Sequence, residues 1–136
     1  MNPNISKAEQ RLVNALKKVI PQIEQQLSIG TYLYDIHYGK KIIEFNGDYW
    51  HANPELYLFE DYVGNILNNK PTYAYEIWAK DAKKKSLAEE HGYEVMVVWE
   101  SEFLEMPRTT LEKCLKFLQW KKGLVDFILQ VLFLYL

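Results

Sequence analysis

The chain has 136 residues and a net charge of −2, and 49% of its residues are hydrophobic, so it is long enough for one compact domain with a substantial core. Charged residues make up 25%, an ordinary value for a globular domain that speaks against extensive disorder. The single cysteine, Cys114, excludes an internal disulfide, argues against a structural zinc site and favours a reducing, cytoplasmic location.

The ends of the chain give no sign of membrane targeting. Residues 1–10 are polar and lack the apolar core of a signal peptide. The apolar run 124–136 is shorter than the roughly 20 residues that span a bilayer, so we expect it to pack as a helix or strand. We therefore expect a main domain over residues 1–123, followed by an apolar tail over 124–136, and no membrane partner.

The first third of the chain predicts one helix and two strands. Ser6 and Glu9 have the spacing of a capping box, and the apolar stripe behind them predicts a helix that Pro21 ends. Residues 21–28 are expected to add a short helical turn. The runs 31–38 and 41–45 are typical of strands.

The remainder predicts helices packed on a small sheet. We expect a polar turn at 46–54, a long loop with local order at 55–71 and a helix from about 72 to 91. A buried strand follows at 93–99. Thr109 and Glu112 repeat the capping-box spacing and predict a helix that reaches about residue 122. This order of elements favours a mixed α/β domain.

A facing pair of carboxylates is expected in the hairpin. With the turn at Gly39 and Lys40, antiparallel pairing places Asp35 opposite Glu44, with Cβ atoms about 4.5–5.5 Å apart. Two carboxylates about 4 Å apart repel by roughly 4 kcal/mol at an effective dielectric of 20. A divalent cation is the simplest compensation, and hard oxygen ligands suit Mg²⁺. The alternative is that Asp35 is an edge residue facing water.

Three further residues could join this pair, and each has a plainer interpretation. Glu9 lies on the apolar face of its helix, but it also suits a capping box. Asp81 interrupts an apolar stripe, but it could simply pair with Lys85. His51 sits in the polar turn; most such histidines are structural, yet beside a metal a neutral imidazole can activate water. Together these residues favour metal-assisted hydrolysis of a phosphodiester.

Three blocks of sequence resemble one nuclease family. SKAEQRLVNAL (6–16) has the pattern S/T-x-x-E-x-R-L, EFNGDYWH (44–51) ends in G-x-x-W-H, and residues 81–100 combine D-x-x-[KR] with G-[YW]-x-V-x-x-x-W-E. These blocks resemble the very-short-patch mismatch repair (Vsr) endonucleases. DYWHANP and VWESEF look closer still to phage homing endonucleases of the EDxHD type. The resemblance covers Ser6 to Phe103 and implies a restriction-endonuclease-like PD-(D/E)xK fold.

The resemblance also implies roles for individual residues. Glu9 is the helix glutamate, Asp35 the principal metal ligand, and Phe45 the variable position, where a backbone carbonyl could face the metal. His51 is the implied base, and Asp81 orients it or a metal-bound water. Glu44 and Asn46 match the acid-x-lysine half of the wider motif, with Asn46 where lysine often stands. The missing charge would have to come from another lysine, and the candidates in the sequence are Lys40, Lys41 and Lys83.

Two departures weaken the match to mismatch repair. Vsr enzymes carry a Cys/His zinc site after the Trp-His pair, whereas Ala52, Asn53 and Pro54 follow here, so we expect no zinc. The N-terminal aromatic wedge residues of those enzymes are also missing. Homing endonucleases usually add a DNA-reading domain, for which this chain has no room, so we expect a catalytic domain or a truncated gene product.

The sequence therefore predicts a Mg²⁺-dependent endonuclease of the phage homing class, with Mn²⁺ as a possible substitute. A mismatch or repair nickase and an inactive nuclease-fold module that only binds DNA are the alternatives. Double-stranded DNA is the expected partner, possibly with a specificity domain or a second copy of the chain. Because the net charge is negative, DNA phosphates must be bound by a local group of lysines. We expect these to be Lys80, Lys83 and Lys84.

Overall fold

The structure is a computed structural model that describes residues 5–118, 127, 129–131 and 133. Its elements follow in the order α1 (Lys7–Val19), β1 (Glu24–Ile29), β2 (Tyr32–Tyr38), β3 (Lys41–Asn46), β4 (Tyr62–Asn65), η1 (Leu67–Asn69), β5 (Pro71–Tyr73), α2 (Ala74–Glu90), β6 (Glu94–Trp99), α3 (Glu100–Glu105) and α4 (Pro107–Phe117).

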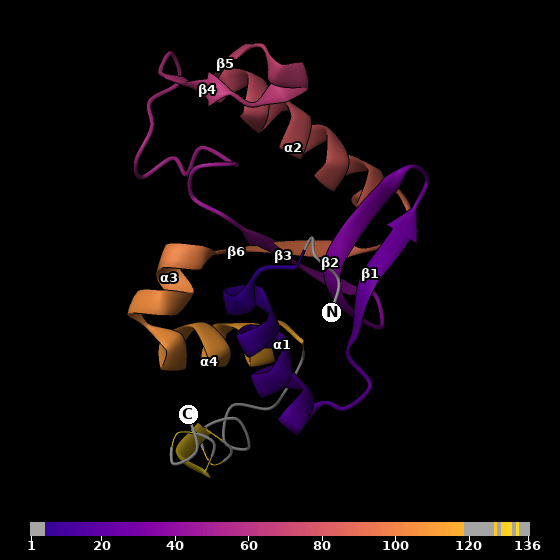
Figure 1. The fold of residues 1–136 in the computed structure, drawn as a ribbon. Coiled ribbons are helices and arrows are strands. Elements are labelled where there is room, and N and C mark those ends of the chain that lie inside the picture. Colours follow the sequence, from indigo (N-terminus) through magenta and orange to yellow (C-terminus); the bar gives the residue numbers. More distant parts are fainter. Residues whose placement is uncertain (1–4, 119–126, 128, 132, 134–136) are drawn as a thin grey trace.

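A mixed four-stranded sheet in the order β1-β2-β3-β6 forms the centre of the molecule. Strands β1, β2 and β3 make an antiparallel meander, and β6 pairs in parallel with β3. A parallel neighbour requires a crossover connection, and α2 lies on that crossover. Helices α1, α3 and α4 lie on one face of the sheet and α2 lies on the other, while β4 and β5 pair near the start of α2 (Figure 1). The predicted mixed α/β class is confirmed.

The two faces of the sheet have separate apolar cores. The larger core joins α1, α3 and α4 to β3 and β6, and its fully buried members include Leu12, Leu16 and Ile43. The smaller core packs Ala88 of α2 against Ile42 and Tyr34. Burial of a large aliphatic side chain contributes about 1.5–3 kcal/mol to the free energy of unfolding, so these contacts hold the helices on the two faces of the sheet.

Strands β2 and β3 separate beyond a short ladder. Their register pairs Tyr38 with Lys41 and Ile36 with Ile43, as the predicted turn requires, and Gly39 at that turn has φ of 56°. On the N-terminal side of Ile36, strand β2 pairs with β1 but no longer with β3, and this part of the hairpin of β1 and β2 extends towards α2 (Figure 1). The position where the strands part is that of Asp35 and Glu44.

Several sequence predictions of local structure are wrong. Residues 24–28, predicted as helical, belong to strand β1, because they pair with β2. The predicted loop 55–71 contains strand β4, and Thr72 belongs to strand β5 instead of α2. The short helix α3 was not predicted. Helix α4 begins at Pro107, a favourable first helical position, and the capping box at Thr109 is not used.

The predicted boundaries of α1 and the predicted C-terminal ends of α2 and β6 hold. Ser6 caps α1 by accepting from the backbone N–H of Glu9, and α1 ends at Val19, before Pro21. Helix α2 stops before Gly92, which has φ of 86°. Strand β6 coincides with the predicted run from residue 94 onward.

Most of the predicted apolar tail lies outside the described residues, as does the predicted end of the last helix beyond residue 118. Within 124–136, Phe127, residues 129–131 and Phe133 are described as helical, and Leu129 is buried in the larger core. None of the helices in the described part of the chain is long and apolar enough to cross a membrane.

Candidate active site

Asp35 and Glu44 meet where β2 and β3 part, and each carboxylate binds a backbone amide of the other strand. Glu44 Oε1 accepts from the N–H of Asp35 at 2.8 Å, and Asp35 Oδ2 accepts from the N–H of Phe45 at 2.8 Å. These two bonds take the place of the backbone hydrogen bonds that would continue the β2–β3 pairing beyond Ile36 and Ile43. The carboxylates are therefore held beside each other by the backbone, as the hairpin register predicted.

The third acid, Glu9, approaches the pair from α1. Its side chain is buried, and its Oε2 atom has no hydrogen-bond partner among the described residues. A buried carboxylate oxygen without a partner carries a free-energy cost of desolvation. The position therefore suits a ligand or a proton more than a purely structural role.

The pKa values of these acids reflect their burial and their proximity to one another. Burial, followed by the charges of Asp35 and Glu44, raises the pKa of Glu9 to about 8. Burial and the charge of Asp35 raise the pKa of Glu44 to about 7, against the lowering effect of Lys84. Burial also raises the pKa of Asp35, opposed by the Phe45 amide, Lys84 and His51. The ionised forms of these acids are therefore disfavoured mainly by burial and, for Glu9 and Glu44, also by the neighbouring carboxylates.

Lys84 contributes the ammonium closest to this charge. Its Nζ atom donates to Glu44 Oε2 at 2.6 Å and lies 4.8 Å from the centre of the Tyr34 ring. The Tyr34 hydroxyl donates to the backbone carbonyl of Lys84 at 2.6 Å, which ties this turn of α2 to β2. Sequence reasoning assigned Lys84 only to DNA binding and missed its pairing with Glu44.

His51 and Asp81 form a second pair beside the first. The Nδ1 atom of His51 lies 2.8 Å from Asp81 Oδ2, and both side chains are about one-third exposed. Because His51 influences the titration of Asp35, the two pairs share one electrostatic environment. The predicted contact between the histidine and the helix aspartate is present in the structure.

The loop that carries His51 is braced at three points. Asp48 accepts from Asn53 Nδ2 at 2.6 Å and from both the N–H and the hydroxyl of Ser101, at 3.0 and 2.7 Å. Although desolvation opposes it, these bonds lower the pKa of Asp48. Trp78 Nε1 donates to the Ala52 carbonyl at 2.7 Å, next to the histidine. Asp48 and Trp78 thus hold the position of His51, a role that the sequence did not reveal.

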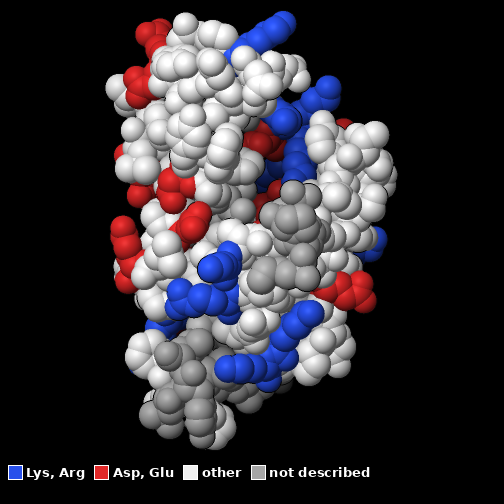
Figure 2. All heavy atoms as spheres, viewed as in Figure 1, with Lys and Arg blue, Asp and Glu red and all other residues white. Residues whose placement is uncertain are grey.

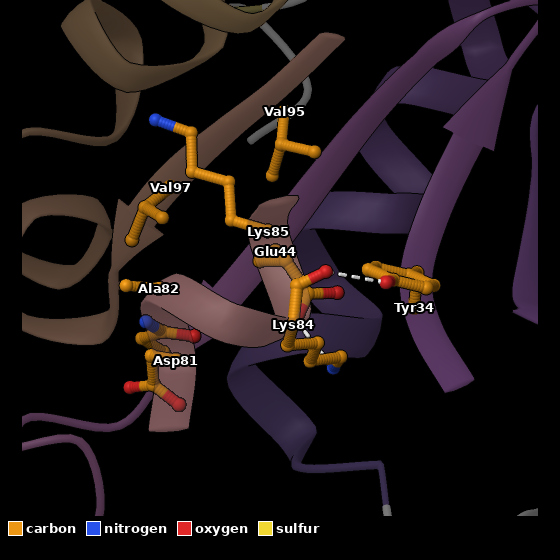
Figure 3. A pocket seen from close by; sticks show the side chains of 9 residues that line it. Tyr34, Glu44, Asp81, Ala82, Lys84, Lys85, Val95 and Val97 are labelled. Carbon is orange, nitrogen blue, oxygen red and sulfur yellow. Dashed lines mark hydrogen bonds and ion pairs between the residues drawn. The ribbon is translucent and has the colours of Figure 1, made fainter. Parts of the chain in front are cut away.

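Two cavities share a wall made by Asp81 and Lys84. One, of about 140 Å³, is lined by Tyr34, Glu44 and Asn46 and by apolar side chains of β6. Figure 3 shows Glu44, Lys84 and Tyr34 gathered around it. The other, of about 280 Å³, is lined by residues that include His51, Lys80 and Leu33. Figure 2 shows atoms of basic and acidic residues together in a hollow at the upper right of the molecule.

The other predicted site residues have different placements. Asn46 is buried at the end of β3 and lines the smaller cavity. The Phe45 side chain packs in the larger core, 6.2 Å from the Phe103 ring centre, while its amide contacts Asp35. Lys80 lines the larger cavity beside His51. Lys83 lies apart from both cavities, in a third hollow beside Leu87.

The lysines that could have replaced the missing motif lysine lie elsewhere. Lys41, the first residue of β3, donates to Glu94 at 2.7 Å, and Lys40, in the turn between β2 and β3, lies over the Tyr93 ring at 4.3 Å. Lys83 lies outside both cavities, whereas Lys84, on the same helix, forms the ion pair with Glu44. None of the candidates Lys40, Lys41 and Lys83 does so.

The donor set fits a hard divalent cation in its chemistry. Asp35 and Glu44 supply oxygen ligands side by side, and the unpartnered Oε2 of Glu9 adds a third carboxylate nearby. In the described part of the chain, no group of three or more His, Cys, Asp or Glu side chains is close enough to hold a metal ion. Of the candidate ligands, the carboxylates of Asp35 and Glu44 lie side by side, and a third protein ligand from the described residues is not in place beside them.

Comparison of the chain with protein-family models, with curated proteins and with solved structures found no match.

Proposed function

We propose that this chain is a metal-dependent DNA endonuclease with a restriction-endonuclease-like PD-(D/E)xK core, of the Vsr-like or EDxHD homing type. The observation that carries the proposal is the convergence of Glu9, Asp35, Glu44, His51 and Asp81, which come from two helices, two strands and a loop. Metal-assisted phosphodiester hydrolysis needs a cation site beside a general base, and in this proposal the carboxylates would provide the first and His51 the second.

His51 is the proton acceptor in this proposal. An imidazole whose Nδ1–H donates to a carboxylate keeps its lone pair on Nε2, so Asp81 selects the tautomer that can accept a proton. A water oxygen would then attack phosphorus and its proton would pass to His51, while the bond from phosphorus to the leaving sugar oxygen breaks and that oxygen takes up a proton from solvent. Asp81 stabilises the resulting imidazolium.

Asp35 and Glu44 would hold the metal ion, with Glu9 close by. When bound, a divalent cation polarises the phosphate and lowers the pKa of bound water. Its two charges would also stabilise the ionised forms of carboxylates whose pKa values are raised by burial. Lys80, beside His51 in the larger cavity, would contact the DNA backbone.

The proposal is tested by incubating the whole chain with supercoiled plasmid in Mg²⁺, in Mn²⁺ and in EDTA. We expect nicked or linear product with either metal and intact plasmid in EDTA. Equal cleavage in EDTA would refute the metal mechanism, and no cleavage under any condition would refute the enzyme.

A second function follows from the ion pair between Lys84 and Glu44. Because Lys84 already neutralises one of the two facing carboxylates, the cleft could bind a phosphate backbone without any metal. The chain would then be a nuclease-fold module that binds DNA without cutting it. DNA binding by gel shift, unchanged by Mg²⁺ and accompanied by no plasmid cleavage, would favour this function.

A further inference from the structure

The side chain of Lys84 occupies the boundary between the two cavities. It lines the smaller one together with Glu44 and the larger one together with His51. A group in this place can reach both the carboxylates and any phosphate that lies against the histidine. Lys80, four residues earlier on the same helix, lines the larger cavity but not the smaller one.

The position of the ammonium is defined by several contacts. Its bond to Glu44 is 2.6 Å long, the Tyr34 ring lies beneath it, and the side chain is 23% exposed. The Tyr34 hydroxyl anchors the backbone of the same residue. An ammonium has three N–H donors, and the bond to Glu44 uses one of them. Lys84 is thus oriented in a way that exposed lysines are not.

The neutral side chain at position 46 leaves a need for positive charge. Asn46 is buried beside the smaller cavity and cannot neutralise an anion. In phosphoryl transfer, negative charge spreads over the non-bridging oxygens, and fixed cations that face them lower the barrier. Lys84 is the cation that the fold brings to this place from α2.

We propose that Lys84 is a catalytic residue whose ammonium donates to a non-bridging oxygen of the scissile phosphate while remaining close to Glu44. The inference rests on the proposed endonuclease function and deepens it. It also differs from the role of a lysine that only attracts the DNA backbone, since such a residue would affect binding and leave the cleavage rate of bound DNA unchanged.

The test is the single-turnover rate of plasmid nicking at saturating protein and saturating Mg²⁺. We expect Lys84→Met to lower this rate about 10²-fold or more, the scale reported for removal of one charge-stabilising donor. Lys84→Arg should recover part of the loss because it keeps the charge. Lys84→Gln, which is neutral but polar, serves as a second variant if methionine disturbs the fold, and it should show the same loss.

Lys18→Met is the matched control, because it removes one positive charge from an exposed position in the last turn of α1, away from the cleft. Its rate should stay within about threefold of wild type. If the wild-type chain nicks DNA and Lys84→Met cleaves at the wild-type rate, or merely needs more Mg²⁺, the inference is overturned and the endonuclease function stands. If the wild-type chain itself does not nick, both fall together.

Discussion

The Nδ1 atom of His51 lies 2.8 Å from Oδ2 of Asp81, although 30 positions separate the two residues in the sequence. The pair joins a braced loop to the middle of α2, and it faces the larger cavity. In the proposed mechanism Asp81 acts only through the histidine, so the two residues should behave as one unit when they are substituted.

His51→Ala should lower the single-turnover nicking rate by about 10²-fold or more, the usual contribution of a general base. Asp81→Asn should have a smaller effect, and the double variant should be no slower than His51→Ala, because the aspartate has no function without the ring. Rates of the three variants at one pH give the answer. Multiplicative losses would show that Asp81 acts independently.

Glu9→Gln should abolish or severely reduce nicking and yet stabilise the metal-free protein at pH 8. The folded chain holds the Glu9 proton up to about pH 8, whereas an unfolded chain releases it near 4.5. Stability of the wild type is therefore lost as pH rises through this window, and the variant escapes the loss. We expect a gain on the order of 1 kcal/mol or more, about 4 °C in Tm.

Thermal melts in EDTA at pH 4.5 and pH 8 measure this difference. The gain should be present at pH 8 and nearly absent at pH 4.5. Glu90→Gln, at an exposed position of α2, is the control and should change neither melt. A Glu9 variant that is less stable than wild type at pH 8 would contradict the assigned burial cost.

Binding of Mg²⁺ should strengthen as pH rises from 6 to 8. Glu44 has a pKa of about 7 and Glu9 of about 8, so both must lose protons before their charges can favour the metal. The apparent affinity should therefore rise by up to about tenfold per pH unit for each proton displaced. Calorimetric titrations in two buffers of different ionisation enthalpy measure the released protons. An affinity that is equal at pH 6 and pH 8 would exclude these acids as ligands.

The facing carboxylates could be predicted because a short turn defines a hairpin register. Gly39 marked that turn, and the observed register, which runs from Tyr38–Lys41 to Ile36–Ile43, ends one position before Asp35 and Glu44. At that position hydrogen bonds from side chains to backbone amides bring the two residues together. The two capping-box patterns were less informative. Ser6 opens α1 as predicted, but Thr109 does not open α4, because the proline two residues earlier begins the helix.

Other features depend on contacts that local patterns do not contain. Strand β1 is rich in glutamine and includes Gln26 with φ of 60°, so its sequence lacks a strand signal, and pairing with β2 decides its conformation. The ion pair of Lys84 and Glu44 spans 40 positions. Several lysines follow one another on α2, and only the packing of the helix on the sheet selects the one that faces the acids.

Lys80→Met should weaken DNA binding several-fold and make it less sensitive to salt. Since Lys80 lies in the larger cavity beside His51, it is expected to neutralise one phosphate, and its loss should reduce the log–log salt slope by about 0.9. Binding curves at three salt concentrations measure the slope, with Lys18→Met as the control. An unchanged slope would place the DNA elsewhere.

Cleavage by this chain should scatter over many sites of a plasmid. Contacts from lysines such as Lys80 position a duplex but do not read bases, and the net charge of −2 gives no long-range attraction. Sequencing of the cut ends at two salt concentrations maps the sites. A single sharp site that persists at high salt would show that the domain reads sequence by itself.

The most direct test of the proposed site compares wild type with Asp35→Asn, purified side by side, in plasmid nicking with Mg²⁺. The substitution keeps the size of the side chain and an oxygen that can accept from the Phe45 amide, but it removes the charge that a metal requires. We predict nicking by the wild type that EDTA stops, and a loss of at least about 10³-fold in the variant at a Tm no lower than that of the wild type, since ligand loss removes several kcal/mol of charge stabilisation. Equal nicking by the two proteins would contradict the assignment of Asp35 and, with it, the endonuclease site.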